Sequence, residues 1–255
     1  MHRVKFKIAL VSLQNWLTIR IVSLGFTRKS TQSLIRVGTS YGGWYIPDSY
    51  LDSNDNKTML SLGVGFDVSF DKALAAAGFN VVLVDPLPDC ISFAQRELSV
   101  FPNCYFENFA VSNFIGSETF FPPKDKYHDA RSSTNIQSTS LESAKTFDVV
   151  TSDSLVEKYK SVISTGLLYL KMDIEGAEVK VIPQICSSPQ KFDFLGIELD
   201  SLSLIPFLKL KKRLVSVLLA RKFLRDLDAA GYKLVRTDNF NFFWKGPENA
   251  QLTAW

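Results

Sequence analysis

Residues 167–178 read Leu-Leu-Tyr-Leu-Lys-Met-Asp-Ile-Glu-Gly-Ala-Glu, and this stretch decides the fold class of the chain. Its first half is an apolar run of strand length, which is typical of a parallel strand covered by helices on both faces. Ligands of open α/β sheets bind at the carboxyl ends of such strands. We therefore expect Asp173 and Glu175 at the functional end of a buried strand. The alternative is that Glu175 and Glu178 only complement the dipole of the next helix, which leaves Asp173 and Lys171 unexplained.

Strand and helix patterns alternate on both sides of this run. Strands are predicted at 58–62, 81–84, 104–109, 147–151, 167–173 and 194–199, and helices at 67–77, 91–100, 175–186 and 204–230. Residues 111–121 predict an additional strand or hairpin. Residues 232–237 and 240–245, joined by Asp238-Asn239, predict a closing β-hairpin. This alternation indicates a doubly wound, mostly parallel sheet with helices on both faces and a terminal antiparallel pair.

Composition and charge restrict the class of protein. The chain has 255 residues, of which 46% are hydrophobic and 22% charged, as expected for one large globular α/β domain. A net charge of +3, without a basic stretch interleaved with aromatics, does not favour a nucleic-acid partner. Its three cysteines are scattered and odd in number, which fits a reducing compartment and a cytoplasmic location.

The N-terminal segment predicts an amphipathic helix. Residues 8–26 are rich in apolar side chains, but Arg20 would be costly at the centre of a bilayer. One stripe of helical spacing runs through the segment, formed by Leu10, Leu13, Leu17, Ile21 and Leu24. We expect this helix to dock on the domain or on a partner, through a peripheral membrane contact or a dimer contact. A membrane anchor is the alternative.

Residues 38–57 are rich in Gly, Tyr, Asp, Ser and Asn, and they predict an irregular connector. The connector holds an aromatic cluster of Tyr41, Trp44 and Tyr45, in which Trp44 is expected to be exposed and available for a dimer contact. The predicted organisation is therefore an N-terminal helix and connector over residues 1–57, followed by one domain over residues 58–255.

Gly63-Val64-Gly65 follows a predicted strand and opens a helix, as a cofactor-binding turn does. Asp85 lies 20 positions after Gly65, where an acid commonly receives ribose hydroxyls. A dinucleotide fingerprint requires a third glycine where this chain has Val68, and no P-loop lysine follows. An adenosine cofactor without phosphates, S-adenosylmethionine, fits better. The alternatives are an ordinary strand-to-helix turn for the glycines and a turn residue before Pro86 for Asp85.

Together these segments resemble the FkbM family of S-adenosylmethionine-dependent methyltransferases. The resemblance is carried by residues 170–178, 61–70, 84–86, 108–112 with Gly116, and 197–198. It implies a class I methyltransferase-like, Rossmann-like sheet of seven strands and a hydroxyl acceptor, often on a sugar or another small molecule. One departure is Ser61, because methyltransferases of this fold commonly carry an acid there to hold the methionine end of the cofactor.

The resemblance also implies roles for individual residues. The implied cofactor-binding residues are Gly63, Gly65 and Asp67 for the methionine and ribose, Asp85 with Pro86 for the ribose, and Asn108 and Ala110 for the adenine. Asp173 and Glu175 would face the transferring methyl group or the acceptor. Asp67, just past the turn, could take the role of the acid that is missing at position 61.

Transfer to a hydroxyl requires removal of a proton, so a general base within hydrogen-bond reach is expected. Asp173 is the first candidate. Lys171 shares its strand parity and could pair with that acid or keep it ionised, and a structural ion pair is the alternative. His128 lies in a loop over residues 122–140 that has the length of a substrate lid, although a lone loop histidine is commonly a plain surface residue.

A metal is not expected as a requirement. Asp173, Glu198 and Asp200 would end neighbouring strands, and carboxylates alone would suit Mg²⁺. Two other functions stay open from the sequence. One is a nucleotide-dependent oxidoreductase on the same sheet, and the other is a non-catalytic relative that binds a partner through the N-terminal helix and the connector.

Overall fold

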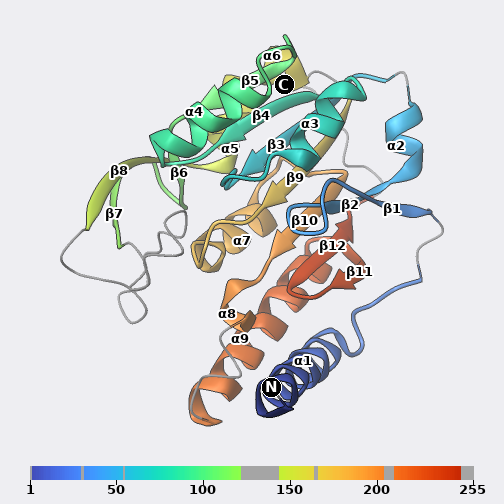
Figure 1. Ribbon diagram of the computed structural model, residues 1–255. Helices are drawn as coiled ribbons and strands as arrows, with labels where there is room; N and C mark the ends of the chain where they lie inside the picture. Colours follow the sequence, from blue (N-terminus) through green and yellow to red (C-terminus); the bar gives the residue numbers. More distant parts are fainter. Residues whose placement is uncertain are drawn as a thin grey trace.

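The computed structural model describes residues 2–29, 32–53, 55–121, 144–163, 166–203 and 210–247. A sheet of seven strands in the order β11-β12-β10-β9-β3-β4-β5 lies between helices on both faces (Figure 1). Its parallel strands are β3 (Lys57–Leu62), β4 (Asn80–Val84), β5 (Cys104–Glu107), β9 (Leu167–Met172) and β10 (Phe194–Glu198). The closing hairpin is β11 (Lys233–Asp238) and β12 (Asn241–Lys245), and β12 runs antiparallel to both β10 and β11. The predicted fold class is confirmed.

The central strand β9 is buried on both faces, which explains its continuous apolar run. Leu170 and Met172 belong to the core cluster on one side of the sheet, and Tyr169 belongs to the cluster on the other side. Lys171 shares the face of Tyr169 and is also buried. A charged group at this depth needs polar partners, so its position in the strand is a structural feature to be explained by the site.

Helices cover the sheet between its strands. They are α3 (Ser69–Ala76), α4 (Pro88–Glu97), α5 (Ser152–Lys158), α6 (Lys160–Ile163), α7 (Glu178–Ser187), α8 (Asp200–Ser203) and α9 (Leu210–Ala229). Helix α7 begins at Glu178, three residues later than predicted, because Glu175 (φ 49°) and Gly176 (φ 98°) are left-handed and cannot belong to a right-handed helix. This turn therefore separates the acids of the motif from the helix that follows them.

A second, three-stranded sheet lies beside the main one. It consists of β6 (Ala110–Val111), β7 (Gly116–Phe120) and β8 (Lys145–Val150). The additional strands predicted over 111–121 and 147–151 are present. Strand β8 lies between the other two, parallel to β6 and antiparallel to β7, and none of the three joins the main sheet.

Helix α1 (His2–Ser23) packs against α9 and α8. The docked side carries Ile19 and Val22, and the Arg221 guanidinium of α9 donates to the Ile21 and Leu24 carbonyl oxygens at the helix end. The predicted stripe does not dock on the domain, since its members Leu13, Leu17, Ile21 and Leu24 are exposed, and its docking on a partner stays a prediction. None of the described helices has the length and apolar character needed to cross a bilayer.

The predicted irregular connector has regular structure. Strands β1 (Leu34–Val37) and β2 (Trp44–Pro47) form an antiparallel hairpin, and the short helix α2 (Asp48–Asp52) follows. Trp44 is 3% exposed and meets Phe243 edge-on, so the prediction of an exposed tryptophan available for a dimer contact is wrong. Its large apolar area is buried against the sheet, whereas Tyr41 in the hairpin turn is 81% exposed.

Candidate functional site

A cleft of about 800 Å³ opens at the carboxyl ends of the parallel strands. Its walls come from six places in the sequence: the glycine turn after β3, the ends of β4, β9 and β10, the connector hairpin, and the turn between β11 and β12. The first and last of these lie some 175 residues apart in the chain, since Gly65 and Phe240 both line the cleft. This is the edge at which the sequence predicts the site.

The two glycines of the turn are required for different reasons. Gly63 has φ +78°, and a Cβ built there would lie 1.7 Å from the Asp173 carbonyl oxygen. The ends of β3 and β9 therefore approach so closely that only glycine fits. Gly65 has φ +61° and faces open space, so it serves the turn conformation and leaves the backbone accessible to a ligand.

Asp85, at the end of β4, fixes the glycine turn through hydrogen bonds to its backbone amides. Its Oδ2 accepts hydrogen bonds from the Val64 and Gly65 amides at 2.9 and 3.1 Å, and its Oδ1 accepts from the Leu87 amide at 2.8 Å. Burial raises the pKa of Asp85, while these amides and the nearby Lys171 ammonium oppose the rise. The carboxylate lines the cleft, and its predicted contact with a ribose stays a prediction.

Asp67 and Asn108 fix the segments on either side of this turn. Asp67 accepts hydrogen bonds from the Thr39 hydroxyl (2.5 Å) and from the Gly42 and Ser69 amides, which ties the connector hairpin to the turn. Partial burial opposes ionisation, but these hydrogen bonds lower the pKa of Asp67 overall. The Asn108 amide donates to the Asp85 carbonyl oxygen at 2.9 Å. Their predicted contacts with the methionine end and the adenine are untested.

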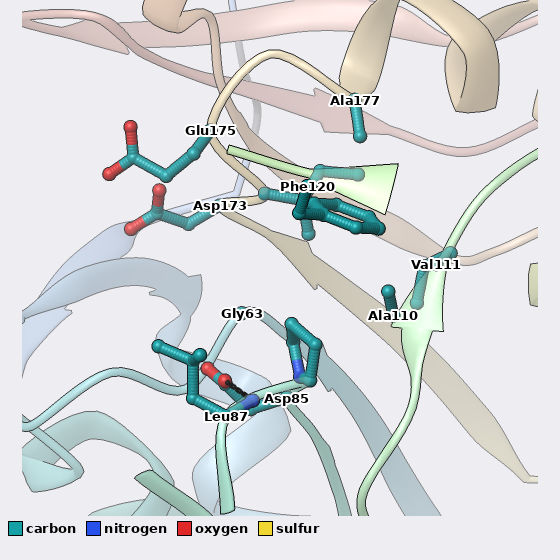
Figure 2. Close-up of a pocket in the computed structure, with 11 residues that line it drawn as sticks. Gly63, Asp85, Leu87, Ala110, Val111, Phe120, Asp173, Glu175 and Ala177 are labelled. Carbon is teal, nitrogen blue, oxygen red and sulfur yellow. Dashed lines mark hydrogen bonds between the residues drawn. The ribbon is translucent and has the colours of Figure 1, made fainter. Parts of the chain in front are cut away.

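An apolar pocket adjoins the cleft on the side of the small sheet (Figure 2). Ala110, predicted to lie near an adenine, lines it together with Pro86. Val111 and Phe120 also line it, and neither was predicted, because a hairpin pattern over 111–121 does not say which side chains reach a neighbouring sheet. Figure 2 places these apolar groups across the pocket from the Asp173 and Glu175 carboxylates.

Lys171 extends across to the neighbouring strand. Its Nζ donates to the Gly63 carbonyl oxygen at 2.7 Å and lies 3.4 Å from the Ser61 hydroxyl. Ser61 and Lys171 are register partners in β3 and β9, and the ammonium lies 5.5 Å from the centre of the Trp44 ring. The position where an acid is common thus holds a buried serine beside a lysine. The predicted pairing of Lys171 with Asp173 stays a hypothesis.

Carboxylates gather on the other side of the cleft. Oxygen atoms of Asp173, Glu175 and Asp200 lie within 4.8 Å of one another, and the first two carboxylates point the same way in Figure 2. Burial, followed by the charges of Glu175 and the other acids, raises the pKa of Asp200 well above its ordinary value. The cluster is therefore an environment that favours proton uptake.

Glu178 lies beneath this cluster and is fully buried. Its Oε2 accepts the Gly176 amide at 2.7 Å, while its Oε1 has no hydrogen-bond partner among the described residues. Burial, reinforced by Glu175 and Asp173, raises the pKa of Glu178 to about 7. The sequence predicted that Glu178 complements the dipole of the next helix, and the motif gave no sign that its side chain is buried.

The predicted metal set was Asp173, Glu198 and Asp200, whereas the three carboxylates that come together are Asp173, Glu175 and Asp200. Glu198 lines the cleft at the end of β10. Acidic clusters are common without an ion, so a Mg²⁺ requirement stays a hypothesis that a chelator would test. His128, predicted as a lid residue, lies outside the described residues.

The hairpin turn contributes residues that sequence reasoning missed. Asn239, Phe240 and Asn241 line the cleft. Strand β12 begins where β10 ends, since Asn241 pairs with Glu198, and the Leu199 amide donates to the Phe240 carbonyl oxygen. The signal was available in the predicted antiparallel hairpin, because a strand that returns beside β10 must start at the functional edge.

Comparisons with known proteins identify the family of the chain. The Methyltransferase FkbM domain family matches residues 54–225, which is more than half of the chain. No curated protein matches. Among solved structures, the chain is similar to the fibrillarin pre-rRNA processing protein of Methanococcus jannaschii, with 10% identity, a TM-score of 0.39, and coverage of 88% of this chain and 85% of that one.

Two further structures are similar at the same distant level. A SAM-dependent methyltransferase from Agrobacterium tumefaciens has 10% identity and a TM-score of 0.37 over 87% of this chain and 75% of that one. A TehB-like SAM-dependent methyltransferase from Corynebacterium glutamicum has 14% identity and a TM-score of 0.31 over 78% and 84%.

Proposed function

This chain belongs to the FkbM family of S-adenosylmethionine-dependent methyltransferases, and from that premise we propose that its acceptor is a hydroxyl of a sugar or another small molecule. The observation that carries the proposal is the group of three carboxylates, Asp173, Glu175 and Asp200, of which the first two line the cleft. A hydroxyl must lose a proton during methylation, and a carboxylate group with raised proton affinity suits that task.

The described residues fit the cofactor. No atom blocks the approach of a ligand to the turn at Gly65, and the Asp85 carboxylate lies next to the same turn. The apolar pocket lined by Ala110 and Phe120 suits an adenine ring. When bound, the cofactor supplies a methyl group on a positively charged sulfur, which needs only a correctly placed nucleophile. Positioning by the protein can then supply much of the rate enhancement.

Two residues would act directly on the acceptor, Asp173 and Glu175, and Lys171 and Asp200 would have supporting roles. Asp173 orients the hydroxyl and accepts its proton, and Glu175 holds the acceptor beside it. Lys171 is a positioning residue, because it binds the Gly63 carbonyl oxygen and so fixes the turn against β9. Burial and the charges of Glu175 and the other acids raise the pKa of Asp200 well above its ordinary value, so this member of the cluster holds a proton more readily than an ordinary aspartate.

The turn between β11 and β12 and the connector hairpin offer groups that suit a sugar. Asn239 and Asn241 offer amide donors and acceptors, and exposed Tyr41 offers an aromatic surface. Amides with a neighbouring aromatic ring match a ligand that presents hydroxyls on one edge and an apolar face on the other. A flat apolar acceptor would leave these amides without partners, which makes it the weaker candidate.

Two measurements test the proposal. Calorimetric titration with S-adenosylmethionine, on the wild type and on Asp85→Ala, should give saturable binding that the substitution weakens. A tritium transfer assay should then methylate sugars or other hydroxyl compounds and leave matched amines and thiols unlabelled. Cofactor binding with labelled amines would contradict the hydroxyl acceptor. Cofactor binding without turnover on any acceptor class would instead support a non-catalytic relative.

A further inference from the structure

We propose that helices α1 and α9 form a docking surface for an anionic membrane. The two-helix face is defined by the exposed apolar residues Leu13, Trp16, Leu17 and Ile21 on α1, and Leu214 and Leu218 on α9. The helices lie side by side at the bottom of Figure 1, at the end of the molecule away from α4 and α6.

Exposed apolar side chains are concentrated on this face. Of the 15 large hydrophobic residues that the described chain exposes, eight lie on α1, at its end (Leu24), or on α9. Each helix buries its opposite side, through Ile19 and Val22 on α1 and through Phe223 and Leu224 on α9. The outward residues are thus spare apolar surface on helices that are already docked, and such patches mark interaction sites.

The charge around this face selects the partner. Residues 1–29 contain six lysines and arginines, residues 210–225 contain another six, and neither segment contains an aspartate or glutamate. The chain as a whole has 29 basic and 26 acidic residues, so two short segments hold a large positive excess. An apolar face on helices rich in lysine and arginine is the composition of helices that lie in the plane of an anionic membrane.

Individual contacts agree with an interfacial role. The Arg20 guanidinium lies 5.2 Å from the centre of the Trp16 ring, so an aromatic side chain and a cation are presented together. Tryptophan and arginine both favour the headgroup level of a bilayer. The Arg221 contacts with the end of α1 hold the two helices together, so they would present their outward residues as one unit.

Two other occupants fit less well. A second copy of the chain would bring two strongly basic faces together across a symmetric interface, where like charges repel. A nucleic acid would match the charge, but single-strand binders use stacked aromatic rings, whereas this face is mainly Leu and Ile with one Trp. An anionic lipid surface satisfies the charge and the aliphatic side chains at the same time.

The face also lies close to the acidic side of the cleft. Helix α8 carries Asp200 and packs against both α1 and α9. A membrane bound by the two-helix face would therefore border the part of the molecule that holds the acceptor cluster.

Vesicle flotation of the full chain tests the proposal, using phosphatidylcholine vesicles with and without phosphatidylserine. We expect binding only with phosphatidylserine, with loss at raised salt. Leu17→Glu with Leu218→Glu should abolish it, whereas Val100→Glu, a change at a still more exposed apolar residue away from the face, should not. Lys211→Gln and Arg225→Gln should each weaken binding by about fivefold, and Lys72→Gln should have no effect.

Two outcomes would overturn the proposal. The first is no binding to phosphatidylserine vesicles, or binding that is equal on neutral vesicles and indifferent to the face variants. The second is a dimer in sedimentation velocity that Leu17→Glu dissociates, which would assign the face to a second copy. Quenching of Trp16 fluorescence by brominated phosphatidylserine vesicles, absent in Trp16→Phe, supplies a readout that folding defects would not produce.

Discussion

The carboxylates on the two walls of the cleft have opposite surroundings. On the glycine-turn wall, Asp85 accepts three backbone amides, and Asp67 accepts two amides and a hydroxyl. On the acidic wall, Asp173, Glu175 and Asp200 lie within 4.8 Å of one another, above the buried Glu178. The first wall uses negative charge to hold backbone, and the second concentrates negative charge where a substrate would arrive.

The two walls therefore have different tasks: one stabilises the shape of the site, and the other provides its reactivity. Hydrogen bonds to a charged group contribute about 1.5–3 kcal/mol each, so the carboxylates of the turn stabilise its conformation. Buried acids close to one another disfavour ionisation, so the acidic wall costs stability while it increases proton affinity. A trade of this kind is expected at sites selected for activity. If the two walls have these separate tasks, substitutions should disturb them separately.

The largest effect is expected at Asp173. Asp173→Asn keeps the shape of the side chain and removes its ability to accept a proton. If Asp173 is the base, kcat should fall by about 10²–10⁴-fold, while the Kd for S-adenosylmethionine changes little. Stopped assays and calorimetry on the same protein would measure both. Glu157→Gln, an exposed acid outside the cleft, is the control. Loss of cofactor affinity with an unchanged kcat would mean that the acidic wall binds the cofactor and does not remove the proton.

The glycine turn offers a matched pair. Gly63→Ala would place a methyl group against the Asp173 carbonyl oxygen and force β3 and β9 apart, so we expect a loss of unfolding free energy of roughly 3–5 kcal/mol. Gly65→Ala meets no atom within 4 Å and strains only a left-handed φ, which costs roughly 1–2 kcal/mol. Urea denaturation would measure the two values, and equal losses would contradict the close approach of the strands.

Glu178 should make stability depend on pH. Its folded pKa of about 7 exceeds the ordinary value of 4.5, so its contribution is complete below pH 4.5 and is lost as pH rises through 7. Glu178→Gln should remove this dependence and stabilise the protein at pH 8 by up to about 3 kcal/mol. Unfolding free energies at pH 5 and pH 8 would show it. Parallel curves for variant and wild type would mean that the acidic wall does not strain this residue.

The sequence was most informative where periodicity and position agree. The apolar run of β9 and the acids after it were placed correctly, since a strand buried on both faces has no other pattern. Gly63, Gly65 and Asp85 came together at the predicted turn because a parallel β-α-β unit fixes that geometry. Their ligand contacts stay predictions.

Orientation was harder to predict than secondary structure. Helix α1 has apolar residues on two sides, so the stripe through Leu17 could not be distinguished from the side through Ile19 and Val22 that docks. Trp44 and Phe120 were misjudged or missed for a similar reason. Each is buried by a strand from a distant part of the chain, and no local pattern records that pairing.

The smallest effect we expect is at Lys171, which joins the two walls. Its Nζ binds the Gly63 carbonyl oxygen beneath the turn, so Lys171→Met should weaken S-adenosylmethionine binding by about tenfold and leave kcat within a few fold of the wild type. Lys57, a second buried lysine, supplies the control. Lys57 is also buried on β3, and its Nζ binds the Ser53 and Ala77 carbonyl oxygens at 2.7 and 3.0 Å.

Because Lys57 lies at the opposite end of β3, Lys57→Met should lower stability without changing cofactor affinity. Equal loss of affinity in both variants would show that any buried lysine supports the site only by supporting the sheet. Ser61→Asp sharpens the test, since it restores an acid opposite Lys171 in the register of β3 and β9. If the lysine neutralises that acid, the double variant Ser61→Asp, Lys171→Met should lose more affinity than the two single changes combined, and simple additivity would place the lysine's influence on the turn alone.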